Sequence, residues 1–152
     1  MYEPIDKIFL EKNLPESALG GDLYKLGWTS EGATFTSFSN YGVEDEDAGK
    51  FYVYDLKTNK KTSTHESLKN LINTIKSSSV TKDKFASVVD IENFMYYCAV
   101  SYIIGNPDDL RNNYNNSYIY FRPDTGKMIV IPYDMDRGLG VNTWNPTGHG
   151  MT

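Results

Sequence analysis

The chain has 152 residues, 39% of them hydrophobic and 23% charged, with a net charge of −5 at pH 7. This length can bury a core, and the twelve Tyr and seven Phe exclude a disordered composition. The acidic balance offers no basic face to a phosphate backbone, so we expect no nucleic acid partner. The single cysteine excludes an internal disulfide and a cysteine-based zinc site. No run approaches the roughly 18 apolar residues of a membrane span, and the acidic start, MYEPIDKIFLEKN, does not have the pattern of a signal peptide.

The first half of the chain predicts a short helix and two strands. Residues 3–13 form the helix, with Pro4 tolerated in its first turn. GGDLYKLGWTS predicts a glycine turn that leads into a strand, and FYVYDLKTNKK alternates like a second strand. Between them, residues 30–49 are rich in Gly, Ser and Asn and end in VEDEDAG. This segment predicts an irregular, solvated loop, because its acidic run lacks the spacing of a calcium-binding loop.

Three helices follow, each with a capping residue. Thr64 is expected to cap the first, Thr81 a short second and Asp90 a third that ends at Gly105. The apolar stripe of the third helix predicts its core face, which consists of Ile91, Phe94, Met95, Cys98, Tyr102 and Ile104.

A polar loop then leads into SYIYF, the turn RPDTG and KMIVIPYD, which together predict a β-hairpin. The Gly-rich residues 141–152 show no period and predict a flexible tail. Helices and strands of this kind predict an α+β fold, with residues 1–152 forming a single domain.

Acidic and amide side chains gather at the open end of this hairpin. Folding it about Asp124 puts Asn116 opposite Pro132 and makes Asn116 a diagonal neighbour of Asp134. Asp136 shares the face of Asp134 as long as the strand continues. A register shift of one residue would put Asn116 on the other face.

Carboxylates this close repel one another unless a cation neutralises them. Hard oxygen ligands suit Mg²⁺ or Mn²⁺, which are usually held by one or two carboxylates together with substrate phosphates. The same residues also fit a plainer interpretation, in which Asp134 pairs with Arg137 or Arg111 and the asparagines satisfy turn backbone.

Residues 105–140, GNPDDLRNNYNNSYIYFRPDTGKMIVIPYDMDRGLG, resemble the signature of the spore coat protein H (CotH) family, the atypical secretory-type protein kinases. That family reads N-x-D, a polar loop, N-Y-Y-L-Y, a turn with T-G-K, and I-P-W-D-L-D before a Gly. Upstream, GDLYK resembles its G-x-L-Y-K strand, and VVDIENFMYYCAVSYIIGNPD resembles its V-D-x-x-N-F helix. Tyr133 replaces the usual Trp and Ser117 replaces a Tyr. The likeness covers roughly residues 1–140.

The resemblance implies phosphoryl transfer from ATP, with Mg²⁺ or Mn²⁺, to a protein serine or threonine hydroxyl. Asp108 matches the catalytic base, with Asp109 as a rival for that role. The matching metal ligands are Asn116, Asp134 and Asp136. The residues expected to bind the nucleotide are Lys25, Asn116 and Asp134.

The same resemblance implies a central and C-lobe-like portion of an atypical kinase fold, with helices packed on a catalytic hairpin. The family's amino-terminal lobe would precede residue 1 and further helical chain would follow Gly140, so activity would depend on those flanks. A protein substrate in a spore coat or outside the cell would be the partner. The alternatives are a structural or binding module that keeps the fold without the chemistry and, with less support, a carbohydrate-binding module.

Overall fold

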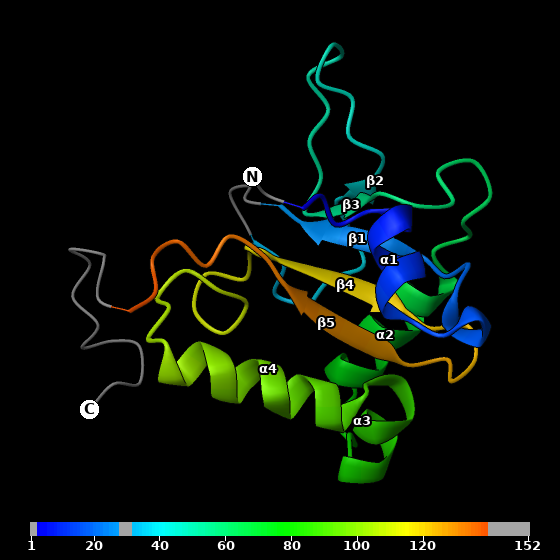
Figure 1. The fold of residues 1–152 in the computed structure, drawn as a ribbon. Helices are drawn as coiled ribbons and strands as arrows, with labels where there is room; N and C mark the ends of the chain where they lie inside the picture. The colour runs from blue at the N-terminus through cyan, green and yellow to red at the C-terminus, as the bar shows by residue number, and fades with distance from the viewer. Residues whose placement is uncertain (1–2, 28–31, 140–152) are drawn as a thin grey trace.

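A mixed five-stranded sheet forms the centre of the molecule, which a computed structural model describes over residues 3–27 and 32–139 (Figure 1). The strand order is β2-β3-β1-β4-β5, and every neighbouring pair is antiparallel except β2 and β3. The strands are β1 (Leu23–Leu26), β2 (Tyr41–Gly42), β3 (Tyr54–Leu56), β4 (Ser117–Phe121) and β5 (Met128–Pro132). The helices are α1 (Lys7–Asn13), α2 (Glu66–Lys76), α3 (Lys82–Val88) and α4 (Ile91–Ile103), with a 3-10 turn at Glu16–Ala18. The α+β class predicted from the sequence is confirmed.

The sheet is covered on both faces. Helices α2, α3 and α4 pack on one face, and α1 packs on the other (Figure 1). Alternation along the strands divides the core accordingly. Tyr24 and Ile119 contact the three-helix side, while Leu23 and Tyr120 contact Leu10 of α1.

The chain enters β1 through a close approach that only glycine permits. A Cβ on Gly21 would lie 1.8 Å from the carbonyl oxygen of Phe121. The absence of a side chain therefore lets this segment lie directly against β4. The Tyr120 hydroxyl holds the same turn, because it accepts from Gly21 N at 2.9 Å and donates to Ala18 O at 2.7 Å.

Two of the four helix starts differ from the prediction. Helix α1 begins at Lys7 and not at residue 3, because the Asp6 carboxylate accepts from Ile8 N and Phe9 N. Helix α2 follows His65, which has a left-handed φ of 58°, so the cap predicted at Thr64 is one residue early. The predicted capping residues Thr81 and Asp90 are confirmed by hydrogen bonds from Lys84 N and Asn93 N.

The predicted core face of α4 is partly wrong. Met95 is 59% exposed and Tyr102 47% exposed, while Tyr97 and Ser101 are buried. Phe94 and Cys98 do pack against the core as predicted. Helix α4 is apolar on nearly every side, so hydrophobic periodicity could not identify the face that meets the sheet.

The predicted hairpin register is also wrong by one residue. Phe121 pairs with Met128 and Ser117 with Pro132, which places Asn116 opposite Tyr133. The cause is the turn: Arg122 N donates to Lys127 O, so four residues, 123–126, form the loop. The turning point therefore lies between two residues and not on Asp124.

Residues 32–49 are irregular apart from β2, but they are not solvated throughout. Ala33 is fully buried, and Phe35, Phe38, Tyr41 and Val43 pack against the core of the three-helix side. The tail predicted for residues 141–152 lies outside the described residues.

Candidate active site

The loop between α4 and β4 carries most of the predicted site residues. It leaves α4 after Gly105, whose φ of 62° ends the helix. It reaches β4 after Asn116, which also has a left-handed φ, of 49°. The Asn116 side chain closes the loop by donating from Nδ2 to Asp108 O at 3.0 Å. Asp108 and Asn116 are therefore brought together by this loop.

Asp109 is the structural centre of this loop. Its side chain is about 1% exposed and accepts from Arg111 N, Arg111 Nε and Asn112 Nδ2 at 2.9, 2.9 and 3.2 Å. Its backbone oxygen accepts from the N–H groups of residues 112, 113 and 114. Internal donors take three of the roughly four acceptor positions of this buried carboxylate, which leaves little of it open to a substrate.

Asp108 has fewer and weaker partners than its neighbour. Asn113 Nδ2 donates to Oδ1 at 2.6 Å, and Arg137 Nε lies 3.6 Å from Oδ2. The Asp108 side chain is 14% exposed. Its backbone N–H donates to Asn106 Oδ1 at 3.1 Å, which orients the residue within the loop. The carboxylate itself contacts only the side chains of Asn113 and Arg137 among the described residues, and a substrate could replace them.

The predicted metal ligands lie where β5 ends. Tyr133 N donates to Asn116 O at 3.2 Å, which places Asp134 next to the residue paired with Asn116. Asp134 has a φ of 52°, so the strand does not continue and the predicted shared face of Asp134 and Asp136 does not form. Both carboxylates are exposed, and neither has a hydrogen bond or ion pair to another described residue.

Lys25 approaches the same end of the sheet from β1. It pairs with Tyr118 of β4, and its Nζ lies 5.2 Å from the centre of the Tyr133 ring. Within the described residues the ammonium has no hydrogen bond or ion pair. The carboxylate of Glu44 interacts with this half-buried cation electrostatically, without forming an ion pair. An ammonium that makes no hydrogen bond can still donate to an anionic ligand.

Lys25 and Asn116 both line a polar cavity of about 240 Å³. Glu44, Asp55 and Asn115 line it too. Asn115 is 8% exposed, and its buried Oδ1 has no hydrogen-bond partner among the described residues. The cavity thus combines one unpaired cation with several oxygen acceptors.

Lys57 organises the acidic wall of this cavity. Its ammonium pairs with the Asp55 carboxylate and with Glu44 Oε2, the latter at 3.1 Å. Burial opposes the charged forms, but these pairings outweigh it and leave the pKa of Glu44 lowered and the pKa of Lys57 raised. Both groups are consequently charged at neutral pH.

Several residues of this site were not singled out from the sequence. Tyr133, which replaces the usual Trp of the family, places its ring near the Lys25 ammonium and packs edge-on against the Tyr118 ring, with 5.3 Å between the ring centres. Asn113 bonds to Asp108 within one loop, whereas Lys57 pairs with Asp55 two residues away and with Glu44 in the preceding irregular segment. The best available clue to Asn113 was the density of asparagines after Asp108.

The whole chain matches one family model. The family is described as CotH kinase protein, and the match covers residues 1–151. The chain belongs to the CotH kinase family. Among curated proteins, no match to the chain was found. The resemblance seen in the sequence motifs is therefore confirmed, and membership in the CotH kinase family indicates a kinase-like function.

Across residues 3–27 and 32–139, no three His, Cys, Asp or Glu side chains gather into a group that could hold a metal ion. No helix in this part of the chain is long and apolar enough to cross a membrane.

Proposed function

We propose that this CotH kinase family member transfers a phosphoryl group from ATP to a serine or threonine hydroxyl of a protein, with Mg²⁺ or Mn²⁺. The observation that carries the proposal is the pairing of Asp108 with Asn116 in one loop, beside the end of β5 at Tyr133. Family membership supports the same chemistry. Family membership further suggests an acceptor protein in a spore coat or outside the cell. We also propose that this region corresponds to the central part and C-lobe of an atypical kinase fold.

Asp108 is the proposed catalytic base. A base must be able to accept the proton of the incoming hydroxyl, and geometry comes before acidity in choosing it. Asp109 is committed to Arg111 and Asn112, whereas Asp108 has one short hydrogen bond and one long ion pair. The structure thus favours Asp108 over its rival on the ground of available acceptor capacity.

Asn116, Asp134 and Asp136 are the proposed ligands of the divalent cation because of their oxygen donors, and not because the described residues hold a preformed group of acidic side chains. Asn116 donates through Nδ2, which leaves its amide oxygen available as a ligand, and both carboxylates are free of described partners. Two or three protein oxygens plus phosphate oxygens match the way Mg²⁺ is usually held in phosphoryl-transfer sites. When bound, the cation would neutralise charge on the transferred phosphate. The Lys25 ammonium would orient the phosphates as a point charge.

Phosphate transfer from labelled ATP to a serine-rich protein tests the role of Asp108. We expect Asp108→Asn to reduce incorporation by about 100-fold or more, because the general base contributes roughly 10² to 10⁴ in rate. Asp83→Asn is the matched control: Asp83 is exposed on α3, outside the site, and this variant should retain full incorporation. Equal incorporation by Asp108→Asn and the wild type would remove Asp108 from the mechanism.

A structural or binding module without catalysis is the second candidate. The ion pair between Arg137 and Asp108 favours it, because the guanidinium lies against the carboxylate oxygen that a substrate would need to reach. Titration calorimetry with Mg²⁺ and ATP separates the two candidates. Heat of binding that is lost in Lys25→Met supports the kinase, and no heat from a folded sample supports the module.

A further inference from the structure

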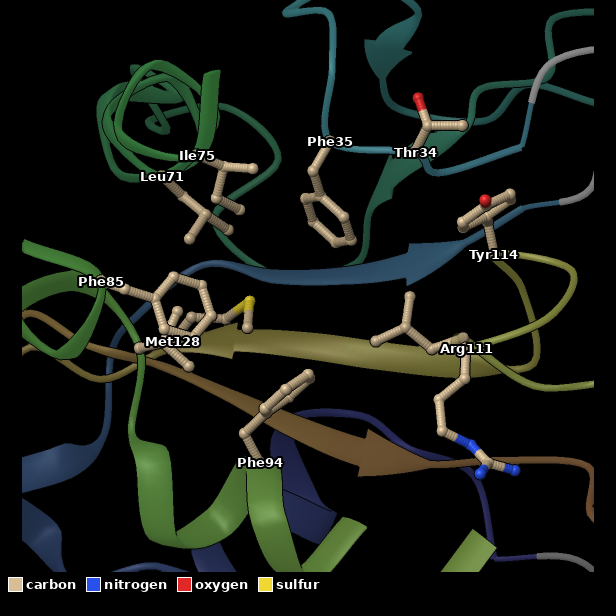
Figure 2. Close-up of a pocket in the computed structure, with 11 residues that line it drawn as sticks. Thr34, Phe35, Leu71, Ile75, Phe85, Phe94, Arg111, Tyr114 and Met128 are labelled. Carbon is tan, nitrogen blue, oxygen red and sulfur yellow. The ribbon is translucent and has the colours of Figure 1, made fainter. Parts of the chain in front are cut away.

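An apolar cavity of about 270 Å³ lies on the three-helix side of the sheet, away from Lys25 and its polar cavity. Its walls come from α2, α3, α4, β5, the segment at residues 34–35 and the loop that carries Asp108. In Figure 2 the side chains of Phe35, Phe85, Phe94 and Ile75 surround a central space. These four are only half-buried, whereas most core residues of this side are covered. Apolar groups that converge without filling the space between them leave room for a ligand.

The charged group and the threonine hydroxyl around this cavity are turned elsewhere or already bonded. The guanidinium of Arg111 points away from the cavity (Figure 2) and binds Asp109 Oδ2 at 2.9 Å and Asn106 O at 3.4 Å. The Thr34 hydroxyl pairs with that of Thr36 at 2.7 Å. A charged ligand would lose its hydration and gain no partner from these groups, which is costly. The walls therefore select an uncharged ligand.

The volume of the cavity limits the size of the ligand. An engineered apolar cavity of about 150 Å³ takes up benzene, and pockets for drug-sized ligands begin near 300 Å³. At about 270 Å³, this cavity matches one substituted ring. A partner helix would need a groove that holds several anchors in a row. We propose that the cavity is a binding site for a small, uncharged aromatic molecule.

Occupation of the cavity would act on the loop that carries Asp108. Leu110, Arg111 and Tyr114 line the cavity and belong to that loop. The stem of Arg111 forms part of the wall while its guanidinium holds Asp109, the structural centre of the loop. Tyr114 has a strained φ of 61°, and its backbone oxygen accepts from Ala33 N at 3.1 Å. A ligand packed against these side chains stabilises the loop, and its effect on catalysis rests on the proposed function.

Methionine methyl NMR of the wild-type chain tests binding directly. Met128 lines the cavity, while Met95 lies exposed on α4 and serves as the internal control. Toluene should shift the Met128 methyl signal with saturation and leave that of Met95 unchanged. Benzoate, the same ring with a charge, should bind at least about tenfold more weakly. The absence of a saturable shift at Met128, or equal affinities for the two compounds, would overturn the proposal.

Cavity filling supplies an independent test. Ile75→Phe places a ring in the space and should weaken toluene binding about tenfold or more, while Ile8→Phe, the same change at an exposed position of α1, should leave it unchanged. Equal effects of the two variants would contradict the site. If Ile75→Phe fails to fold, the wild-type methyl titration decides alone.

Hydrogen exchange tests the coupling to the loop. Toluene should slow exchange of the amides at residues 110–114 several-fold. Binding at Met128 without any change in this exchange would overturn the proposed action on the loop. None of these measurements needs phosphoryl transfer, so failure of this site and failure of the proposed kinase activity are distinguishable.

Discussion

Asp108 and Asp109 are adjacent residues of the same type, and only their partners separate their roles. Asp109 is enclosed by Arg111 and by the backbone N–H groups of its own loop. Asp108 contacts one amide and one distant guanidinium, which can give way to a substrate. The sequence left the choice between them open, because nothing in the residue order shows which carboxylate the loop turns inward.

Lys57 provides a test of electrostatics at the same scale. Lys57→Met leaves the Asp55 carboxylate, which is 6% exposed, without its cation. We expect the free energy of unfolding at pH 7 to fall by about 2 kcal/mol, the usual range for a hydrogen bond to a charged group. Urea denaturation measures this, and Lys60→Met, a change of an exposed lysine in the following turn, should have little effect.

The pH dependence of that difference has a defined sign. The folded pKa of Glu44 is lowered from 4.5, so its contribution is complete above pH 4.5 and is lost as the pH falls through the folded pKa. The folded pKa of Lys57 is raised from 10.5, so its contribution is complete below pH 10.5 and is lost at higher pH. The difference between wild type and Lys57→Met should therefore shrink at pH 3. A constant difference from pH 7 to pH 3 would contradict the pairing with Glu44.

Helix α4 is joined to the sheet by one amide side chain. Asn93 Nδ2 donates to Val130 O at 3.2 Å, and Asn93 Oδ1 accepts from Val130 N at 2.7 Å. The asparagine of the V-D-x-x-N-F motif thus serves the attachment of α4 to β5. The aspartate of that motif, Asp90, caps α4 and donates its backbone N–H to Met128 O at 2.9 Å.

Removing the Asn93 amide should weaken the attachment of α4 to β5. We expect Asn93→Ala to lower the free energy of unfolding by about 2 kcal/mol, because two backbone groups of β5 lose their partner. Asn73→Ala, at an exposed position of α2, is the matched control and should change stability by less than about 0.5 kcal/mol. Urea denaturation of both variants gives the comparison, and equal midpoints would show that Asn93 is not the attachment.

The elements that the sequence predicted well are those with local signals. Thr81 and Asp90 each accept from a backbone N–H three residues later, so the helix start is encoded within one turn. The hairpin register depends on how many residues form the turn, and a one-residue error there moved Asn116 from opposite Pro132 to opposite Tyr133. The helix starts at Thr81 and Asp90 were therefore predictable from the sequence, and the register of the β4–β5 hairpin was not.

At the scale of the whole molecule, the site depends on the order of the strands. Lys25 and Tyr133 meet because β4 separates β1 from β5 by a single strand. The sequence predicted strands at β1, β4 and β5. It did not indicate that β1 lies inside the sheet, beside β4, and not at an edge. The motifs therefore predicted candidate residues for the site, while the contacts among strands required the assembled sheet.

The outer face of α4 gives a further test at this scale. Met95 and Ile103 are 59% and 76% exposed, although the helix is apolar on nearly every side. We expect Met95→Lys and Ile103→Lys to change the free energy of unfolding by less than about 0.5 kcal/mol while reducing aggregation at high concentration. Denaturation together with light scattering checks both effects. A large loss of stability would show that this face is covered.

The attachment of α4 also determines whether the outer edge of β5 can pair with a strand of another chain. Residues 128, 130 and 132 present their backbone groups to that side, because alternate residues of a strand share an edge. Asp90 N donates to the carbonyl of Met128, and the Asn93 side chain bonds both the N–H and the carbonyl of Val130. Pro132 has no N–H group. Strand addition from another chain finds no free ladder there. The attachment of α4 thus protects the β5 edge of the sheet from edge-to-edge pairing with another chain.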